Sequence, residues 1–169
     1  MTGWWALAFV VLWLLVVVLC IVVIALARQV GTLHLRLGPR GALEIDDEGP
    51  ALGEPLPTVP AVTADGSQVS IGGTGRPRLV LFASETCVVC REVSPGVPAA
   101  AAAGRLDAIV IHDPEAERTL GVPGTPFVVV LDEDGIVRAK GTVNNLEQVE
   151  GLVDTANRRI TEERRQWAS

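Results

Sequence analysis

The sequence has few of the residues from which several common kinds of site are built. It contains three cysteines in 169 residues, too few for a scaffold held together by disulfides. Lys140 is its one lysine and its formal net charge is −6, so no basic patch is large enough to indicate a nucleic-acid partner. Near the C-terminus, Arg158, Arg159, Arg164 and Arg165 are expected to be a solvated helix end that matches the helix dipole.

Charged residues are also missing from one long stretch, between Trp4 and Ala27. A helix of that length rises roughly 36 Å, enough to cross a hydrocarbon layer of about 30 Å. A cleaved signal peptide is the competing interpretation, because residues 25–27 imitate a cleavage site. The apolar run is longer than a signal-peptide core, however, and no Lys or Arg precedes it. Residues 1–28 are therefore predicted to be a retained transmembrane anchor in the lipid bilayer.

The remaining chain divides by composition into three parts. Residues 29–55 mix glycine, proline and charge and are predicted to be a juxtamembrane linker, with Gly38-Pro39 expected to stop any extension of the membrane helix. Residues 56–160 have the patterns of a small α/β domain, and residues 161–169 are predicted to be a C-terminal tail.

The elements of the domain are predicted from apolar runs and turn residues. Continuous apolar runs of strand length indicate buried strands, and apolar residues at helical spacing indicate helices. In chain order they are two short strands in 61–71 around Asp65-Gly66, a strand at 78–84, a helix opened by a cysteine pair, a strand at 108–113, a helix at 114–121, a hairpin at 126–141 around Asp134-Gly135, and a last helix from Asn144. Pro95 and Pro98 are expected to kink or end the cysteine helix. Asn144 and Glu147 resemble a capping box at the start of the last helix.

The cysteine pair, Cys87 and Cys90, allows several kinds of site. Structural zinc needs four ligands, but Cys20 lies in the apolar stretch and the two histidines stand alone, so no metal is predicted. A c-type haem site requires histidine directly after the second cysteine, where this chain has Arg91. Two buried cysteines without a chemical role remain the plain alternative.

The position of the pair favours redox chemistry. Cys87 falls where a buried strand gives way to the start of a helix, and unpaired N–H groups at a helix start lower the pKa of a thiol. Cys90 lies one turn further on the same side. Cys87 is therefore predicted to be the attacking sulfur and Cys90 the resolving one. No cofactor beyond the disulfide is predicted.

A second motif makes a family resemblance specific. By itself, the Thr125-Pro126 bond in GVPGTPFVV is most simply an ordinary trans bond at a strand start. Together with a strand, a C-x-x-C helix start and Pro95, however, it resembles the thioredoxin fold, a central mixed sheet flanked by helices. The resemblance implies a cis bond at Pro126, facing the disulfide, and a loop through Thr125 and Pro126 that binds an extended client chain.

The N-terminal part narrows the resemblance. A single span that leads through ALARQVGTLHLRLGPRGAL to a C-x-x-C domain resembles membrane-tethered proteins of the TlpA and ResA type. Within that type it is most similar to MauD, the accessory protein of methylamine dehydrogenase maturation. MauD-like proteins also occur outside methylamine metabolism, so the client stays open.

Four positions depart from the thioredoxin pattern. Leu81 stands where thioredoxins carry a buried acid that takes the resolving thiol's proton, and Thr86 stands where a tryptophan commonly precedes the first cysteine. Glu85, the nearest carboxylate, is expected to point to solvent. Val88 and Val89 between the cysteines are expected to bury the pair and so to raise the thiol pKa.

The sequence thus predicts a membrane-anchored thiol–disulfide oxidoreductase that acts on cysteines of a client protein. It is expected to exchange electrons with a membrane-embedded redox partner, in a direction left open. The missing acid favours an alternative, a thioredoxin-like scaffold or binding subunit of a membrane complex with a permanent disulfide. A peroxide-reducing protein is a third possibility. Such proteins typically resemble T-x-x-C at this place, and residues 84–87 match that motif only loosely.

The charges around the span and the family resemblance imply opposite sides of the membrane for the C-terminal domain. Arg28, Arg36 and Arg40 follow the span and no Lys or Arg precedes it, and this asymmetry would keep the domain in the cytoplasm. The resemblance implies the opposite, because the tethered proteins work outside the cytoplasm, where disulfides persist. The prediction is a single-pass membrane protein with an extracytoplasmic domain.

Overall fold

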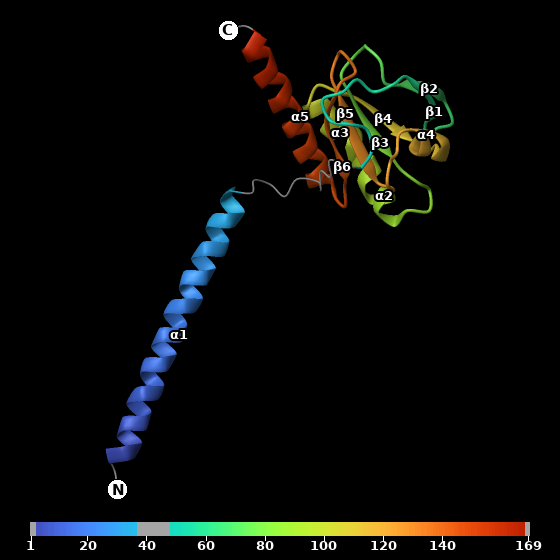
Figure 1. Cartoon of the computed structure of the whole chain (residues 1–169). Helices are drawn as coiled ribbons and strands as arrows, with labels where there is room; N and C mark the ends of the chain where they lie inside the picture. Colours follow the sequence, from blue (N-terminus) through green and yellow to red (C-terminus); the bar gives the residue numbers. More distant parts are fainter. Residues whose placement is uncertain (1–2, 37–47, 168–169) are drawn as a thin grey trace. The chain divides into compact units, whose positions relative to one another are not determined.

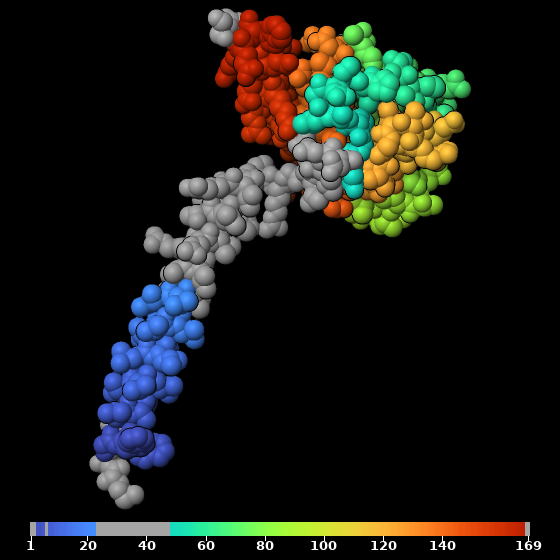
Figure 2. Space-filling view, in the orientation of Figure 1, coloured from blue at the N-terminus to red at the C-terminus, as the bar shows by residue number. Residues whose placement is uncertain are grey.

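The N-terminal part of the chain is one long helix. The computed structural model describes residues 3–36 and 48–167, and contacts divide the chain into two units, Met1–Gly38 and Pro39–Ser169. Helix α1 spans Gly3–Arg36, and over Gly3–Val22 it is long and apolar enough to cross a membrane by length and composition. The described apolar side chains of that stretch are exposed along the helix (Figure 2). The stop expected at Gly38-Pro39 lies outside the described residues.

The second unit is a small α/β domain (Figure 1). Its strands are β1 (Val59–Val62), β2 (Gln68–Ile71), β3 (Arg78–Phe82), β4 (Asp107–Ile111), β5 (Phe127–Leu131) and β6 (Val137–Thr142), and its helices are α2 (Val88–Val93), the 3-10 turn η1 (Ser94–Gly96), α3 (Val97–Ala103), α4 (Pro114–Thr119) and α5 (Leu146–Trp167).

Four of the strands form a mixed sheet in the order β4-β3-β5-β6, and β1 and β2 form a separate hairpin. Strand β3 pairs with β4 in parallel and with β5 antiparallel, and β5 pairs antiparallel with β6. A bridge between Thr63 and Ile111 joins the hairpin to the β4 edge. This is the predicted mixed sheet, and helices pack on both of its faces.

The two faces of the sheet bury two separate apolar cores, because side chains alternate between the faces along each strand. On one face, side chains such as Leu79, Leu81 and Val128 pack against α2, α3 and α5. On the other, side chains such as Val80, Phe82 and Val129 pack against the hairpin and α4. Strands β3 and β5 are buried along nearly their whole length, as their continuous apolar runs predict.

The predicted elements are present in the predicted order, with one error at a helix cap. Asn145, not Asn144, caps α5: its side-chain oxygen accepts a hydrogen bond from the N–H of Gln148, at 2.9 Å. The side chain of Gln148 accepts in return from the N–H of Asn144, at 2.6 Å. The reciprocal cap is therefore shifted by one residue from the predicted Asn144 and Glu147. The prolines act as expected, because η1 separates α2 from α3 around Pro95.

Residues at the end of the predicted linker pair with strand β6. The N–H of Gly53 donates to the carbonyl of Val137 at 2.8 Å, and the N–H of Val137 donates to the carbonyl of Glu54 at 3.0 Å. The ammonium group of Lys140, a fully buried residue, donates to the carbonyl of Glu48 at 2.8 Å. These bonds protect the edge of β6 from pairing with another chain.

The last turns of α5 pack against the β5–β6 hairpin. Arg138 forms ion pairs with Asp132, at 2.5 Å, and with Glu163. Arg159 is half-buried rather than solvated as predicted, and its Nη1 donates to the carbonyl of Arg138 at 2.8 Å. Helix α5 therefore continues through residues 161–167 with specific contacts to the domain.

Candidate functional site: a disulfide facing a cis-proline loop

Cys87 is the residue immediately before helix α2. Its backbone is extended, with φ −81° and ψ 117°, and its N–H donates to the carbonyl of Ser84 at 3.1 Å, which closes the turn after β3. Its sulfur accepts a hydrogen bond from the N–H of Cys90 at 3.1 Å. The sequence of a buried strand, a turn and a helix start thus places this sulfur against an unpaired helix N–H, the arrangement that stabilises a thiolate.

Cys87 and Cys90 are joined by a disulfide, and their Cα atoms are 5.2 Å apart. The two sulfurs have different surroundings. Cys87 is half-buried, whereas Cys90 is only 2% exposed and belongs to the core formed with α3 and α5. An incoming molecule can therefore approach Cys87 and not Cys90.

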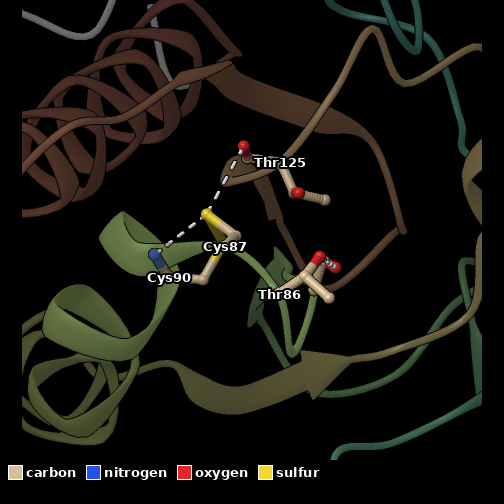
Figure 3. Close-up of a disulfide and its surroundings, with 5 residues drawn as sticks. Thr86, Cys87, Cys90 and Thr125 are labelled. Atoms are coloured by element: carbon tan, nitrogen blue, oxygen red, sulfur yellow. Dashed lines mark hydrogen bonds between the residues drawn. A yellow bond between two sulfur atoms is a disulfide. The ribbon is translucent and has the colours of Figure 1, made fainter.

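The loop before β5 lies beside the disulfide (Figure 3). The Thr125-Pro126 bond is cis, which confirms the family-based prediction and not the local one. The carbonyl oxygen of Thr125 lies 3.8 Å from the sulfur of Cys87, and in the reduced protein the S–H group of Cys87 can donate to it. The strand register explains why the turn that carries Cys87 and the loop before β5 lie together, because Phe82, the last residue of β3, pairs with Phe127, the first residue of β5. The four predicted site residues therefore lie together, while their roles stay predictions.

The surroundings of the pair differ in part from those predicted. Leu81 is fully buried below the disulfide and pairs with Val110 of β4, so an apolar side chain occupies the position of the thioredoxin acid. Glu85 is exposed, as expected. Val88 is 58% exposed, which contradicts the prediction that it buries the pair, because the first residue of α2 faces away from the core. Val89 alone packs against the core.

An open pocket of about 400 Å³ reaches the buried side of the disulfide. Its lining residues are Ala64, Ser84, Glu85, Cys90, Arg91, Ser94, Pro95, Val110 and His112. The pocket was not predictable from the sequence, because its walls come from four separate segments. The one sequence feature that could have indicated a site here is His112, which follows a predicted buried strand and stands two residues beyond Val110.

Two carboxyl groups near this pocket have shifted pKa values. Burial raises the pKa of Glu117, as does the charge of Asp113, and His112 opposes them. Burial alone would raise the pKa of Asp113, but hydrogen bonds from the N–H groups of Ala116, Glu115 and Val62 hold it below its usual value. Among the residues whose side chains the structure describes, no cluster of three His, Cys, Asp or Glu could hold a metal ion.

A C-x-x-C disulfide at a helix start, opposite a cis-proline loop on this mixed sheet, defines a thioredoxin-like protein. Solved structures have the same fold. A candidate protein disulfide isomerase from Bacteroides thetaiotaomicron is 18% identical with a TM-score of 0.54, over 72% of this chain and 99% of that one. A candidate thiol:disulfide interchange protein DsbE from Chlorobium tepidum is 19% identical with a TM-score of 0.51, over 64% and 99%. At these identities the likeness establishes the fold alone.

Curated relatives identify the family. The methylamine utilization protein MauD of Methylorubrum extorquens is 33% identical over 171 residues, which cover 86% of this chain and 83% of the relative. MauD of Paracoccus denitrificans is 33% identical over 180 residues, covering 91% and 90%. The chain therefore belongs to the MauD family of methylamine utilization proteins, as its sequence predicted. No protein-family model matches it.

Proposed function

We propose that the protein is a thiol–disulfide oxidoreductase whose reactive group is the Cys87–Cys90 pair. One observation carries this proposal: the two sulfurs are bonded at the start of α2, and the more accessible one accepts an N–H hydrogen bond that would stabilise its thiolate. The thioredoxin-like fold of the solved neighbours is consistent with it. The disulfide itself carries the two electrons, so the reaction uses no further cofactor.

The exchange has two steps, written here for reduction of a client. The thiolate of Cys87 attacks a client disulfide, forms a mixed disulfide, and releases one client sulfur as a thiolate, which takes up a proton. Cys90 then loses its proton and attacks the sulfur of Cys87. The Cys87–Cys90 disulfide forms and the mixed disulfide breaks, which releases the second client sulfur as a thiolate that takes up a proton. Two electrons have then passed to the client. Oxidation of a client is the same sequence in reverse.

The client binds along the Thr125-Pro126 loop. Pro126 is buried and Thr125 is half-buried, with its carbonyl 3.8 Å from the sulfur of Cys87. An extended client chain that crosses this loop brings its own cysteine to the half-buried sulfur. Backbone contacts of this kind do not depend on the client's side chains, which suits a protein that acts on cysteines in different sequences.

The site works at a membrane, on the extracytoplasmic side. Helix α1 anchors the protein in the bilayer, because its apolar part is long enough to span it. Disulfides persist in oxidising compartments, so a disulfide exchanger is placed best outside the cytoplasm, where a membrane-embedded redox protein supplies or removes its electrons. Because the relatives are named for methylamine utilization, cysteine-containing proteins of that system are the first clients to test.

The proposal is tested on full-length protein in detergent micelles, with Cys20→Ala introduced to remove the third thiol. Differential thiol trapping and mass spectrometry should show that Cys87 and Cys90 lose and regain two electrons together across a series of redox buffers. The midpoint gives the reduction potential, which decides whether the protein makes or removes disulfides.

Single variants separate the two roles. Cys90→Ser should accumulate mixed disulfides with clients, and Cys87→Ser should form none. A pair that stays oxidised in every buffer, or a Cys87→Ser variant that leaves client maturation unchanged, would instead establish the scaffold with a permanent disulfide.

A further inference from the structure

The buried sulfur needs a route for its proton. Cys90 is 2% exposed, and it must become a thiolate before it can attack the mixed disulfide. Burial disfavours a thiolate that has no partner. Leu81, which is fully buried, offers no proton acceptor at the position where thioredoxins carry an acid. Another group must therefore receive the proton of Cys90.

The register of the sheet points to one such group. Leu81 of β3 pairs with Val110 of β4. Side chains two residues apart along an extended strand share one face, so His112 follows Val110 on the face that carries Leu81. Both Val110 and His112 line the pocket that reaches Cys90. The pocket is open to solvent and has a volume of about 400 Å³, so bulk water, at roughly 30 Å³ per molecule, can enter it from outside.

We propose that His112 exchanges protons with Cys90 through water in this pocket. The inference rests on the proposed function and names the residue that takes over the task of the missing acid. The S–H bond of Cys90 breaks, its proton passes through water to a neutral ring nitrogen of His112, and the sulfur keeps the electron pair with which it attacks Cys87. The departing client thiolate then takes a proton from solvent, and His112 returns its own to solvent.

The groups around His112 suit this exchange. Glu117, on α4, lies close enough to His112 for their charges to interact, and Asp113 is the next residue in the sequence. Glu85 and Arg91 also line the pocket, and Arg91 is the residue after Cys90 in the sequence. Asp65, in the turn between β1 and β2, and Glu92, on α2, are further charged groups on segments that line the pocket. Carboxylates in general are weak bases at neutral pH, whereas imidazole titrates near pH 6.5.

A two-phase reaction separates the steps. Full-length reduced protein with Cys20→Ala, in micelles, is mixed with one equivalent of 5,5′-dithiobis(2-nitrobenzoate). Attack by Cys87 releases the first thionitrobenzoate, and attack by Cys90 releases the second. The rate of the second release should rise with pH and then level off, because only a neutral ring of His112 can take the proton that reaches it through water.

His112→Gln should slow the second release at neutral pH by about tenfold or more, the lower range of general-base effects. Its rate should keep rising with pH, because hydroxide then has to remove the proton, and the first release should be unchanged. In His112→Ala, imidazole added to the buffer should enter the open pocket and restore the rate. Glu85→Gln, which changes another titratable group of the same pocket, is the matched control and should behave like the parent protein.

The outcomes distinguish the two proposals. A parent protein that never releases a second equivalent contradicts the proposed function itself. Normal second release from His112→Gln, a slow release with an unaltered pH profile and no rescue by imidazole, or a loss found in Glu85→Gln instead, each overturns the role of His112 and leaves the proposed function in place.

Discussion

The two cysteines of the pair are identical in chemistry and differ only in their surroundings. Cys87 precedes a helix, accepts an N–H hydrogen bond and faces a loop carbonyl. Cys90 lies one turn further, in the apolar core. Its exposure and the N–H donor favour Cys87 as the attacking thiolate, and burial protects the sulfur of Cys90 from outside reagents. The division of roles therefore follows from the position of each residue on one short helix.

Asp113 provides a residue-scale prediction about pH. Its carboxylate accepts hydrogen bonds from the N–H groups of Glu115, Ala116 and Val62, at 2.9, 3.2 and 3.1 Å, so it caps α4 and holds the β1 end. Asp113→Ala should lower the free energy of unfolding at neutral pH by about 1–2 kcal/mol. Urea unfolding of the full-length protein in micelles, followed by circular dichroism, measures the change.

The pH dependence has a definite sign. Because the pKa of Asp113 is lowered in the folded protein, its contribution is complete above the unfolded value of about 3.9 and is lost as the pH falls through the folded value. The stability difference between the parent and Asp113→Asn should therefore be largest above about pH 5 and shrink below pH 4. Asp107→Asn, at the exposed ion pair with Arg76, should change little. A difference of constant size at every pH would show that the charge is not involved.

Single residues were predictable from the sequence where a motif fixes their position. They were not predictable where tertiary packing decides whether a side chain is buried or exposed. The C-x-x-C spacing and the strand before it located Cys87 and Cys90. Val88 is apolar yet exposed, because it is the first residue of a helix that buries its opposite side. Lys140 is charged yet fully buried, because its ammonium group reaches a carbonyl of a segment far away in the sequence.

Among the elements, the β5–β6 hairpin depends on the conformation of Gly135. Its φ is +75°, and a Cβ built there would lie 2.4 Å from the carbonyl oxygen of Gly73. Gly135→Ala should therefore destabilise the domain by more than the roughly 1–2 kcal/mol of a left-handed backbone alone. Gly121→Ala is the matched control, since Gly121 has φ +65° with nothing within 4 Å. The same urea experiment compares them, and equal losses would show that the hairpin can move away from Gly73.

Elements were predictable because their signals are local. Continuous apolar runs marked β3 and β5, and Pro95 marked the interruption between α2 and α3. The cap of α5 was placed one residue early because Asn144 and Asn145 are adjacent and each has a Glu or Gln three residues later. Only the hydrogen bonds of the folded chain decide between two such pairs, here in favour of Asn145 and Gln148.

For the whole domain, the site is assembled by the register of the sheet. The turn after β3 and the loop before β5 meet because Phe82 pairs with Phe127, and His112 joins them because β4 runs parallel to β3. The family resemblance predicted that the turn after β3 lies next to the loop before β5, because both segments carry motifs of the family. No motif marks His112, and its place in the same pocket as Cys90 follows from strand pairing that single-sequence patterns do not specify.

The orientation of the chain in the membrane is the last prediction. The arginines that follow the span favour a cytoplasmic domain, whereas the proposed disulfide chemistry favours an oxidising compartment. We expect the chemistry to decide, so a bacterial alkaline phosphatase fused after Ser169 should be exported and active, because that enzyme needs its own disulfides. Green fluorescent protein fused at the same site should stay dark.

Charge variants show how strongly the arginines oppose this orientation. Arg28→Gln combined with Arg36→Gln removes two of the three positive charges that follow the span. The double variant should leave the phosphatase fusion at least as active as the parent, because the charge bias against export is then weaker. A fusion that accumulates without phosphatase activity, with a fluorescent counterpart, would place the domain in the cytoplasm. The Cys87–Cys90 pair would then face a reducing pool, and its working state would be the dithiol.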